Sequence, residues 1–140
     1  MAVPDLVFDL LPPDALRQFI ADHIDMHNVA QTGRTDWRPL GYFLRDARAE
    51  WVGGLVCYVW GGWLYVRLLW VVGSLRGQSQ GTRLLLAAEN HARALGATAA
   101  TLETFSFQAP SFYQRHGYIV FATLEDYPPG PTKFFLRKIL

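Results

Sequence analysis

The chain has 140 residues, of which 51% are apolar, and its thirteen basic and twelve acidic residues leave a net charge of +1. This length predicts one domain over residues 1–140 with a real core, and the charge balance gives no basis for binding nucleic acid or an anionic membrane. The single cysteine, Cys57, excludes an intramolecular disulfide and a four-cysteine zinc site, and it is typical of a cytoplasmic protein.

The first quarter of the chain predicts a strand followed by a helix. Residues 3–10 form a short apolar run that we interpret as a strand, and the segment lacks the basic start and long apolar core of a signal peptide. Pro12-Pro13 then opens a helix, since proline is tolerated in a first helical turn. One stripe at helical spacing contains Leu16, Phe19, Ile20, His23, Ile24 and His27.

The middle of the chain predicts three strands, over residues 40–46, 50–60 and 63–71. Residues 51–72 carry one charge, Arg67, and are long enough to span a bilayer as a helix. Gly61-Gly62 at the centre, the β-branched and aromatic content, and the deep position of Arg67 favour two strands joined by a tight turn instead.

The second half predicts a helix over 81–95 ended by Gly96, a strand over 98–105, a short helix or turn closed by Gly117, and strands over 118–124 and 133–140. A strand, helix and strand in succession imply a parallel pair. The fold class is therefore α/β (α+β), with a mixed, mostly antiparallel sheet of about seven strands, a central parallel pair and flanking helices.

The loop over residues 73–82 is rich in glycine and leads from a strand into a helix. Free amides at a helix start favour anions such as pyrophosphate, and Arg76 adds charge. The loop lacks the lysine of a P-loop and the three glycines of the dinucleotide fingerprint. A plain strand-to-helix turn and a nucleotide-binding loop both stay open on this segment alone.

Two motifs together resemble the GNAT superfamily of acyl-CoA-dependent N-acyltransferases. The first is the loop 76–81, Arg-Gly-Gln-Ser-Gln-Gly, and the second is residues 106–113, Ser-Phe-Gln-Ala-Pro-Ser-Phe-Tyr, followed by Gly117-Tyr118. They occur in family order, with one helix and one strand between them. Three positions depart from the family pattern: Ser79 replaces a glycine, Ser106 replaces an asparagine, and Arg67 stands where many relatives have an acid.

The resemblance implies a GNAT-like fold and an N-acetyltransferase that moves acetyl from acetyl-CoA to a primary amine of a small molecule or peptide. It implies a homodimer for some members, in which the sheet ends or the C-terminal strand form the contact. The residues that it assigns to acetyl-CoA are Leu69, Trp70, Val71, Arg76, Gly77, Gln78, Ser79, Gln80, Gly81, Thr82, Ser106, Gln108, Ala109 and Phe112.

Two residues are candidates for chemical roles. The resemblance implies that the Tyr113 hydroxyl lies near the thioester sulfur as general acid. Glu103 is the strand carboxylate nearest in sequence, and it is a candidate base for the amine, unless the amine arrives neutral. Direct attack needs no covalent enzyme intermediate, so Cys57 is interpreted as a core residue.

Alternatives remain at the level of sequence. His23 and His27 have a spacing that can chelate a metal, but no third ligand is evident, and we expect no metal site. A catalytically silent acyl-CoA-binding or regulatory domain would keep the same loop, and the departures at Arg67 and Ser79 keep that reading open.

Overall fold

The computed structural model describes residues 2–140, and the chain divides into two compact units, with the boundary in the sequence between Thr35 and Asp36. The first unit contains helix α1 (Asp14–Thr32), which begins after Pro13 as predicted and ends at Gly33 with a φ of 68°. The predicted strand over residues 3–10 is not formed. A strand needs a hydrogen-bonded partner, and side chains in this segment such as Leu6 and Val3 are 100% and 90% exposed.

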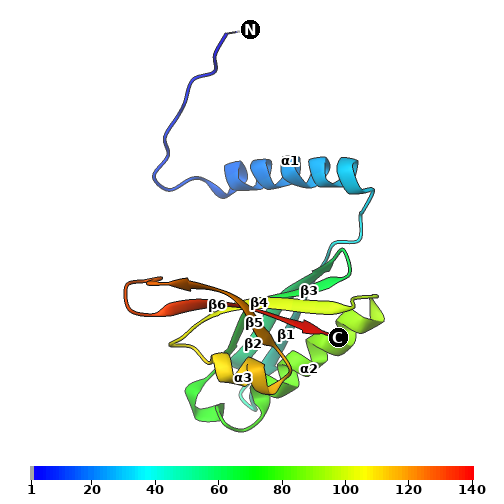
Figure 1. The fold of residues 1–140 in the computed structure, drawn as a ribbon, viewed down its shortest axis with the longest axis vertical. Coiled ribbons are helices and arrows are strands. Elements are labelled where there is room, and N and C mark those ends of the chain that lie inside the picture. The colour runs from blue at the N-terminus through cyan, green and yellow to red at the C-terminus, as the bar shows by residue number, and fades with distance from the viewer. Residues whose placement is uncertain (1) are drawn as a thin grey trace. The chain divides into compact units, whose positions relative to one another are not determined.

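The second unit is a six-stranded sheet with two helices and a short 3₁₀ turn (Figure 1). In chain order its elements are β1 (Arg38–Arg45), β2 (Trp51–Trp60), β3 (Trp63–Val71), η1 (Gly73–Leu75), α2 (Gln80–Ala94), β4 (Ala99–Phe105), α3 (Pro110–Arg115), β5 (Ile119–Glu125) and β6 (Thr132–Ile139). These bounds lie within a few residues of the predicted elements. The mixed α/β class with a parallel pair is confirmed, and six strands replace the expected seven or so.

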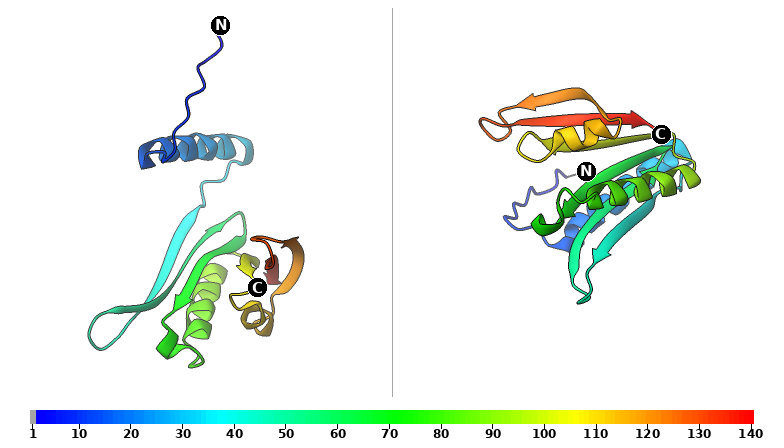
Figure 2. Two further views of the ribbon diagram at one scale, coloured as in Figure 1. Left: turned by 90° about the vertical axis from the view of Figure 1, so that its left-hand side faces the viewer. Right: turned by 90° about the horizontal axis from the view of Figure 1, so that it is seen from below.

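The sheet consists of two antiparallel halves that share one short parallel seam. Its strand order is β1-β2-β3-β4-β6-β5, and every neighbouring pair except β3 and β4 is antiparallel. The parallel pairing runs only from Trp63↔Ala99 to Val66↔Leu102. Beyond it the two halves diverge, as the right-hand view of Figure 2 shows. A register shift against β2 falls at the same point, because Val66 and Leu68 pair with consecutive residues and Arg67 between them is bulged.

Two predictions about strands concern residues 51–72 and the C-terminal strand, and only the first is confirmed. Residues 51–72 form β2 and β3 around the Gly61-Gly62 turn as predicted, and no helix among residues 2–140 is long and apolar enough to cross a membrane. The suggestion that the C-terminal strand offers a dimer edge is wrong, because β6 is paired on both sides and the edges of the sheet are β1 and β5.

The core lies on the face of the sheet that α2 covers. Helix α2 buries Leu84, Leu85, Ala88 and Ala92 at helical spacing, and it contacts all three strands of the first half. Phe112 and Tyr113 of α3 pack against the same cluster. Both helices therefore lie on one side, and they flank the place where the halves diverge.

Candidate functional site

A cavity of about 790 Å³ opens where β3 and β4 separate. Its walls come from the end of β3, the loop into α2, the middle of β4 and the segment containing α3. The lining residues are Val66, Arg67, Leu68, Leu69, Trp70, Val71, Leu75, Arg76, Gly77, Ser79, Gln80, Gly81, Thr82, Leu102, Glu103, Thr104, Phe107, Gln108, Ala109, Phe112, Tyr113 and Arg115.

The structure brings all but two of the sequence-predicted site residues to this cavity. The exceptions are Gln78 and Ser106, whose side chains hydrogen-bond to backbone groups outside the cavity lining. Gln78 Nε2 donates to the Ser74 carbonyl at 3.0 Å. Ser106 Oγ accepts from the Thr132 N–H at 3.0 Å, and the Ser106 N–H donates to the Thr132 carbonyl at 2.8 Å. Eight further lining residues lie outside the sequence prediction: Val66, Arg67, Leu68, Leu75, Leu102, Thr104, Phe107 and Arg115. Phe107 and Arg115 lie within or just beyond the second motif.

The start of α2 presents backbone amides to the cavity. Ser79 precedes the helix with a φ of 63°, and no side chain caps this end. The first helical N–H with a helical partner is that of Arg83, which donates to the Ser79 carbonyl at 3.0 Å. The amides that precede Arg83 in the first turn have no acceptor within the helix, so they are available to a ligand. They also lie at the positive end of the helix dipole.

Gly81 is closely packed within this turn. A Cβ at this position would lie 3.3 Å from the Phe112 ring, which is tighter than most real contacts of that kind. The missing side chain therefore lets α3 approach the first turn of α2. This contact joins the two sequence motifs in space.

Arg76 is anchored at the end of β3. Its Nε donates to the Val71 carbonyl at 3.1 Å, and the residue lines the cavity beside the first turn of α2. The remaining guanidinium donors are therefore held near the free amides. Together these groups form a site suited to a diphosphate.

Tyr113 lies on α3 among aromatic rings. The rings of Phe112 and Tyr118 contact it edge to face, with centroids at 5.1 Å and 5.9 Å. Burial raises the pKa of Tyr113 to about 12. The hydroxyl is therefore protonated throughout the neutral range, which is the state that a proton donor needs.

Glu103 lies on β4 at the other side of the cavity. The Lys133 ammonium is 3.4 Å from its Oε2, and the Tyr65 hydroxyl lies near enough for the carboxylate charge to act on it. Burial raises the pKa of Tyr65, and the Glu103 charge raises it further. Lys133 itself lies 5.1 Å from the Tyr127 ring centroid and 5.3 Å from that of Phe135.

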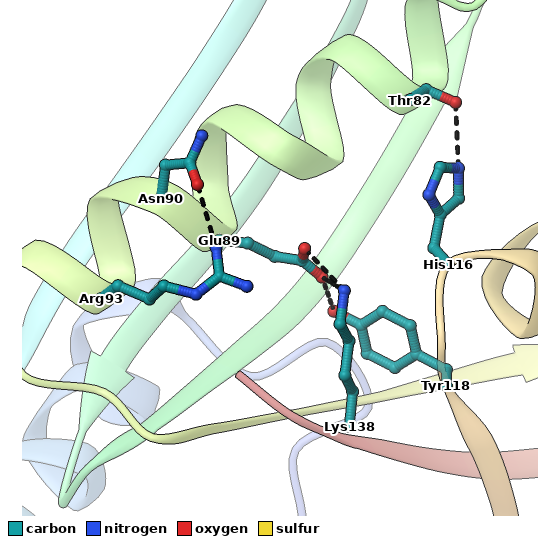
Figure 3. A network of polar contacts seen from close by, with 7 residues as sticks. All are labelled: Thr82, Glu89, Asn90, Arg93, His116, Tyr118 and Lys138. Carbon is teal, nitrogen blue, oxygen red and sulfur yellow. Dashed lines mark hydrogen bonds and ion pairs between the residues drawn. The ribbon is translucent and has the colours of Figure 1, made fainter.

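A second polar network holds the helices in place (Figure 3). The Glu89 side chain of α2 is fully buried, and it accepts hydrogen bonds from Tyr118 Oη at 2.8 Å and from Lys138 Nζ at 2.9 Å. Thr82, in the first turn of α2, lies 2.9 Å from Nε2 of His116 at the end of α3. These contacts fix both cavity-forming helices against the second half of the sheet.

The remaining candidate residues form no reactive cluster. Cys57 is 2% exposed, and burial raises the pKa of its thiol to about 11, so a thiolate nucleophile is disfavoured. His23 Nδ1 lies 2.7 Å from the Phe19 carbonyl of its own helix. Among residues 2–140 no three His, Cys, Asp or Glu side chains are grouped closely enough to hold a metal ion.

Comparison with known proteins agrees with this geometry. The model of the acetyltransferase (GNAT) family matches residues 7–118. This chain belongs to the GNAT acetyltransferase family. A blasticidin-S acetyltransferase of Streptomyces morookaense is 47% identical over 107 residues, covering 74% of this chain and 79% of that protein. Membership identifies the chain as an acyltransferase enzyme.

Two solved structures share the fold. An acetyltransferase candidate from Agrobacterium tumefaciens is 31% identical with a TM-score of 0.91, over 98% of this chain and 100% of that chain. A streptothricin acetyltransferase candidate of Bacillus anthracis, solved in complex with acetyl coenzyme A, is 17% identical with a TM-score of 0.64, over 73% of this chain and 62% of that chain. The family fold is thereby confirmed for this chain.

Proposed function

We propose that this protein transfers an acetyl group from acetyl-CoA to a primary amine by direct attack. One observation carries the proposal. The parallel pairing of β3 and β4 stops at Val66 and Leu102, and the cavity that opens there contains the start of α2, Tyr113 and Glu103 together. An anion site, a proton donor and a carboxylate thus share one cavity.

The residues present fit acetyl-CoA as a co-substrate. The free amides at Gln80 to Thr82 and the Arg76 guanidinium hold the diphosphate. The backbone of Leu69 to Val71 pairs with β2 on one side and has no partner on β4. The polar groups that face away from β2, apart from the Val71 carbonyl that Arg76 engages, are therefore free to hydrogen-bond the pantetheine amides. The complex of the Bacillus anthracis fold neighbour with acetyl coenzyme A supports this assignment.

The chemistry needs one bond made and one broken. The amine nitrogen attacks the thioester carbonyl carbon, the C–N bond forms, and the C–S bond breaks. Glu103 takes one proton from the ammonium, and the neutral amine that results attacks. The nitrogen loses a second proton when the tetrahedral intermediate collapses, and solvent carries an equivalent proton back to Tyr113 after its hydroxyl has protonated the leaving thiolate. The products are an N-acetyl amide and free CoA. No covalent enzyme intermediate is formed, which agrees with the buried position of Cys57.

The acceptor is a primary amine of a small molecule or peptide. A relative at 47% identity is named for blasticidin S, so that compound is the first acceptor to test. The near-neutral charge of the whole chain offers no general attraction for polycations. Recognition therefore depends on side chains inside the cavity.

The test is thiol release from acetyl-CoA across a panel of primary amines that includes blasticidin S. We expect amine-dependent release and an acetylated amine detected by mass spectrometry. Calorimetric titration with CoA, acetyl-CoA and ATP forms the second arm. Competition by ATP as strong as by CoA would contradict the acyltransferase site. Tight acetyl-CoA binding without release from any amine would instead indicate a silent binding domain.

A further inference from the structure

Arg67 is an unpaired cation in the wall of the cavity. The residue is exposed and lines the cavity. Three other cations of this unit are engaged: Lys133 pairs with Glu103, Lys138 pairs with Glu89, and Arg76 donates to a carbonyl. Within residues 2–140, no hydrogen bond, ion pair or ring contact engages the Arg67 guanidinium. Its donors are available to a ligand.

The position of Arg67 separates it from the diphosphate site. Arg67 precedes Val71, where β3 ends beside Arg76, by a strand length of about 13 Å. It is the bulged residue that follows the last parallel pair, Val66↔Leu102. Glu103 directly follows Leu102 on β4. Arg67 and the proposed base therefore each follow the last parallel pair directly, on the two strands that separate to form the cavity.

The Tyr65 hydroxyl is influenced by the charges of both Glu103 and Arg67. Burial makes the largest contribution to the raised pKa of the Tyr65 hydroxyl, and the Glu103 carboxylate raises this pKa further. The Arg67 guanidinium lowers it. One hydroxyl thus feels a negative and a positive group at once. The cavity lining contains both a carboxylate and a guanidinium, which together are the complement of a molecule carrying an ammonium and an anion.

We propose that Arg67 binds a carboxylate of the acceptor, so that the preferred substrates are amines that also carry a carboxylate. Glu103 faces the amino group and Arg67 faces the carboxylate of the same molecule. This inference rests on the proposed acetyl transfer and names the substrate class of the same site.

The chemistry of the guanidinium selects this class. Its planar fork matches a carboxylate through two parallel N–H···O bonds. A phosphate dianion would need further positive charge beside Arg67, and the Lys133 ammonium is already paired with Glu103. A purely cationic amine would place a second positive charge against Arg67 and would be disfavoured.

The experiment uses the full-length protein and a panel of primary amines in matched sets. Each set contains an amino acid, its methyl ester and its primary amide, so that only the charge of the carboxylate changes. We expect at least one amino acid to be acetylated with a kcat/KM about ten-fold or more above that of its ester and amide, as a charge-assisted hydrogen bond requires. The KM for the acceptor should carry most of this difference.

Variants at Arg67 complete the test. Arg67→Gln should raise the KM for the amino acid about ten-fold and leave the ester and amide unchanged, which erases the preference. Arg67→Lys should restore part of it, because the charge returns without the fork. The KM for acetyl-CoA and the melting temperature serve as controls, and both should stay at the wild-type values.

Each other outcome overturns the inference. Equal turnover of acid, ester and amide, or an unchanged preference in Arg67→Gln, would show that Arg67 does not read a carboxylate, while acetyl transfer itself would stand. Absence of turnover with every amine would remove the acetyl transfer and this inference together. The two failures are therefore distinguishable.

Discussion

Glu89 and Lys138 form an ion pair of 2.9 Å in which the Glu89 side chain is wholly buried (Figure 3). The residues come from α2 and β6, so the pair crosses from one half of the sheet to the other. The Tyr118 hydroxyl supplies a further hydrogen bond to the same carboxylate. A buried charge is tolerated only when it is paired and hydrogen-bonded in this way.

Removing the cation should destabilise the protein strongly. Lys138→Met leaves the Glu89 carboxylate buried without its counter-charge, and we expect the free energy of unfolding to fall by about 3 kcal/mol. Urea denaturation measures the effect. Arg17→Ala, which breaks the exposed Arg17–Asp14 pair of α1, is the control and should cost less than about 1 kcal/mol. A similar small cost for both variants would contradict a structural role of the buried pair.

A glycine at position 79 should stabilise the turn into α2. Ser79 has a φ of 63°, a left-handed conformation that costs a residue with a Cβ roughly 1 kcal/mol. Ser79→Gly removes this cost, and we expect a higher melting temperature and an acetyl-CoA affinity at least equal to that of the wild type. Ser74→Gly in η1, where φ is not positive, should lower the melting temperature slightly. Destabilisation by Ser79→Gly would show that the serine hydroxyl makes an overriding contribution.

Loss of the Tyr113 hydroxyl should slow turnover without weakening co-substrate binding. Tyr113→Phe keeps the ring contacts with Phe112 and Tyr118 but removes the proposed proton donor. We expect kcat to fall about 100-fold with an unchanged Kd for acetyl-CoA. Tyr58→Phe, whose ring stacks on Tyr65 outside the cavity lining, should retain normal turnover. Normal kcat in Tyr113→Phe would remove this residue from the mechanism.

Burial of the Cys57 thiol should make the free energy of unfolding fall at alkaline pH. Its pKa is raised by burial from 9.0 to about 11, so above pH 9 the unfolded chain loses the thiol proton before the folded chain does. The protonated thiol contributes fully to the free energy of unfolding below pH 9. This contribution, about 2 to 3 kcal/mol, is lost as the pH rises toward 11.

Comparison with Cys57→Ala isolates this effect. The variant is expected to be less stable than the wild type below pH 9, because it leaves a small cavity. The gap between the two proteins should narrow from pH 9 to 11, as measured by urea denaturation at each pH. A constant gap across that range would show that the Cys57 thiol does not titrate on unfolding in this way.

Most of the fold could be predicted from local patterns. Gly61-Gly62 between two apolar runs predicted the β2–β3 hairpin, and both residues have a positive φ. Gly96 and Gly117 predicted the ends of the two helical segments for the same reason. The error over residues 3–10 has a physical cause: β-propensity describes a residue's fitness for a half-buried sheet, and it cannot supply the partner strand.

The site was predictable where motifs fixed the backbone and less so where tertiary contacts decide. Ser106 was placed at the ligand by its motif position, but its hydrogen bonds hold β6 at Thr132, a partner 26 residues away that spacing cannot reveal. Glu89 was missed altogether. Its position four residues after Leu85 on the apolar stripe was a usable signal, because a charged residue on a buried helix face requires a paired counter-charge.

The short seam between the two halves of the sheet has a consequence for the dimensions of the enzyme. Helix α2, whose first turn we propose as the diphosphate site, packs on the first half, whereas Tyr113 belongs to the segment between the strands of the second half. The distance between the proposed diphosphate site and the proposed proton donor therefore depends on how the two halves of the sheet are held together, and neither half sets it alone. Glu89 connects the two halves through its contacts with Tyr118 and Lys138. A residue remote from the proposed chemistry therefore helps to set the length that acetyl-CoA must span between these two points.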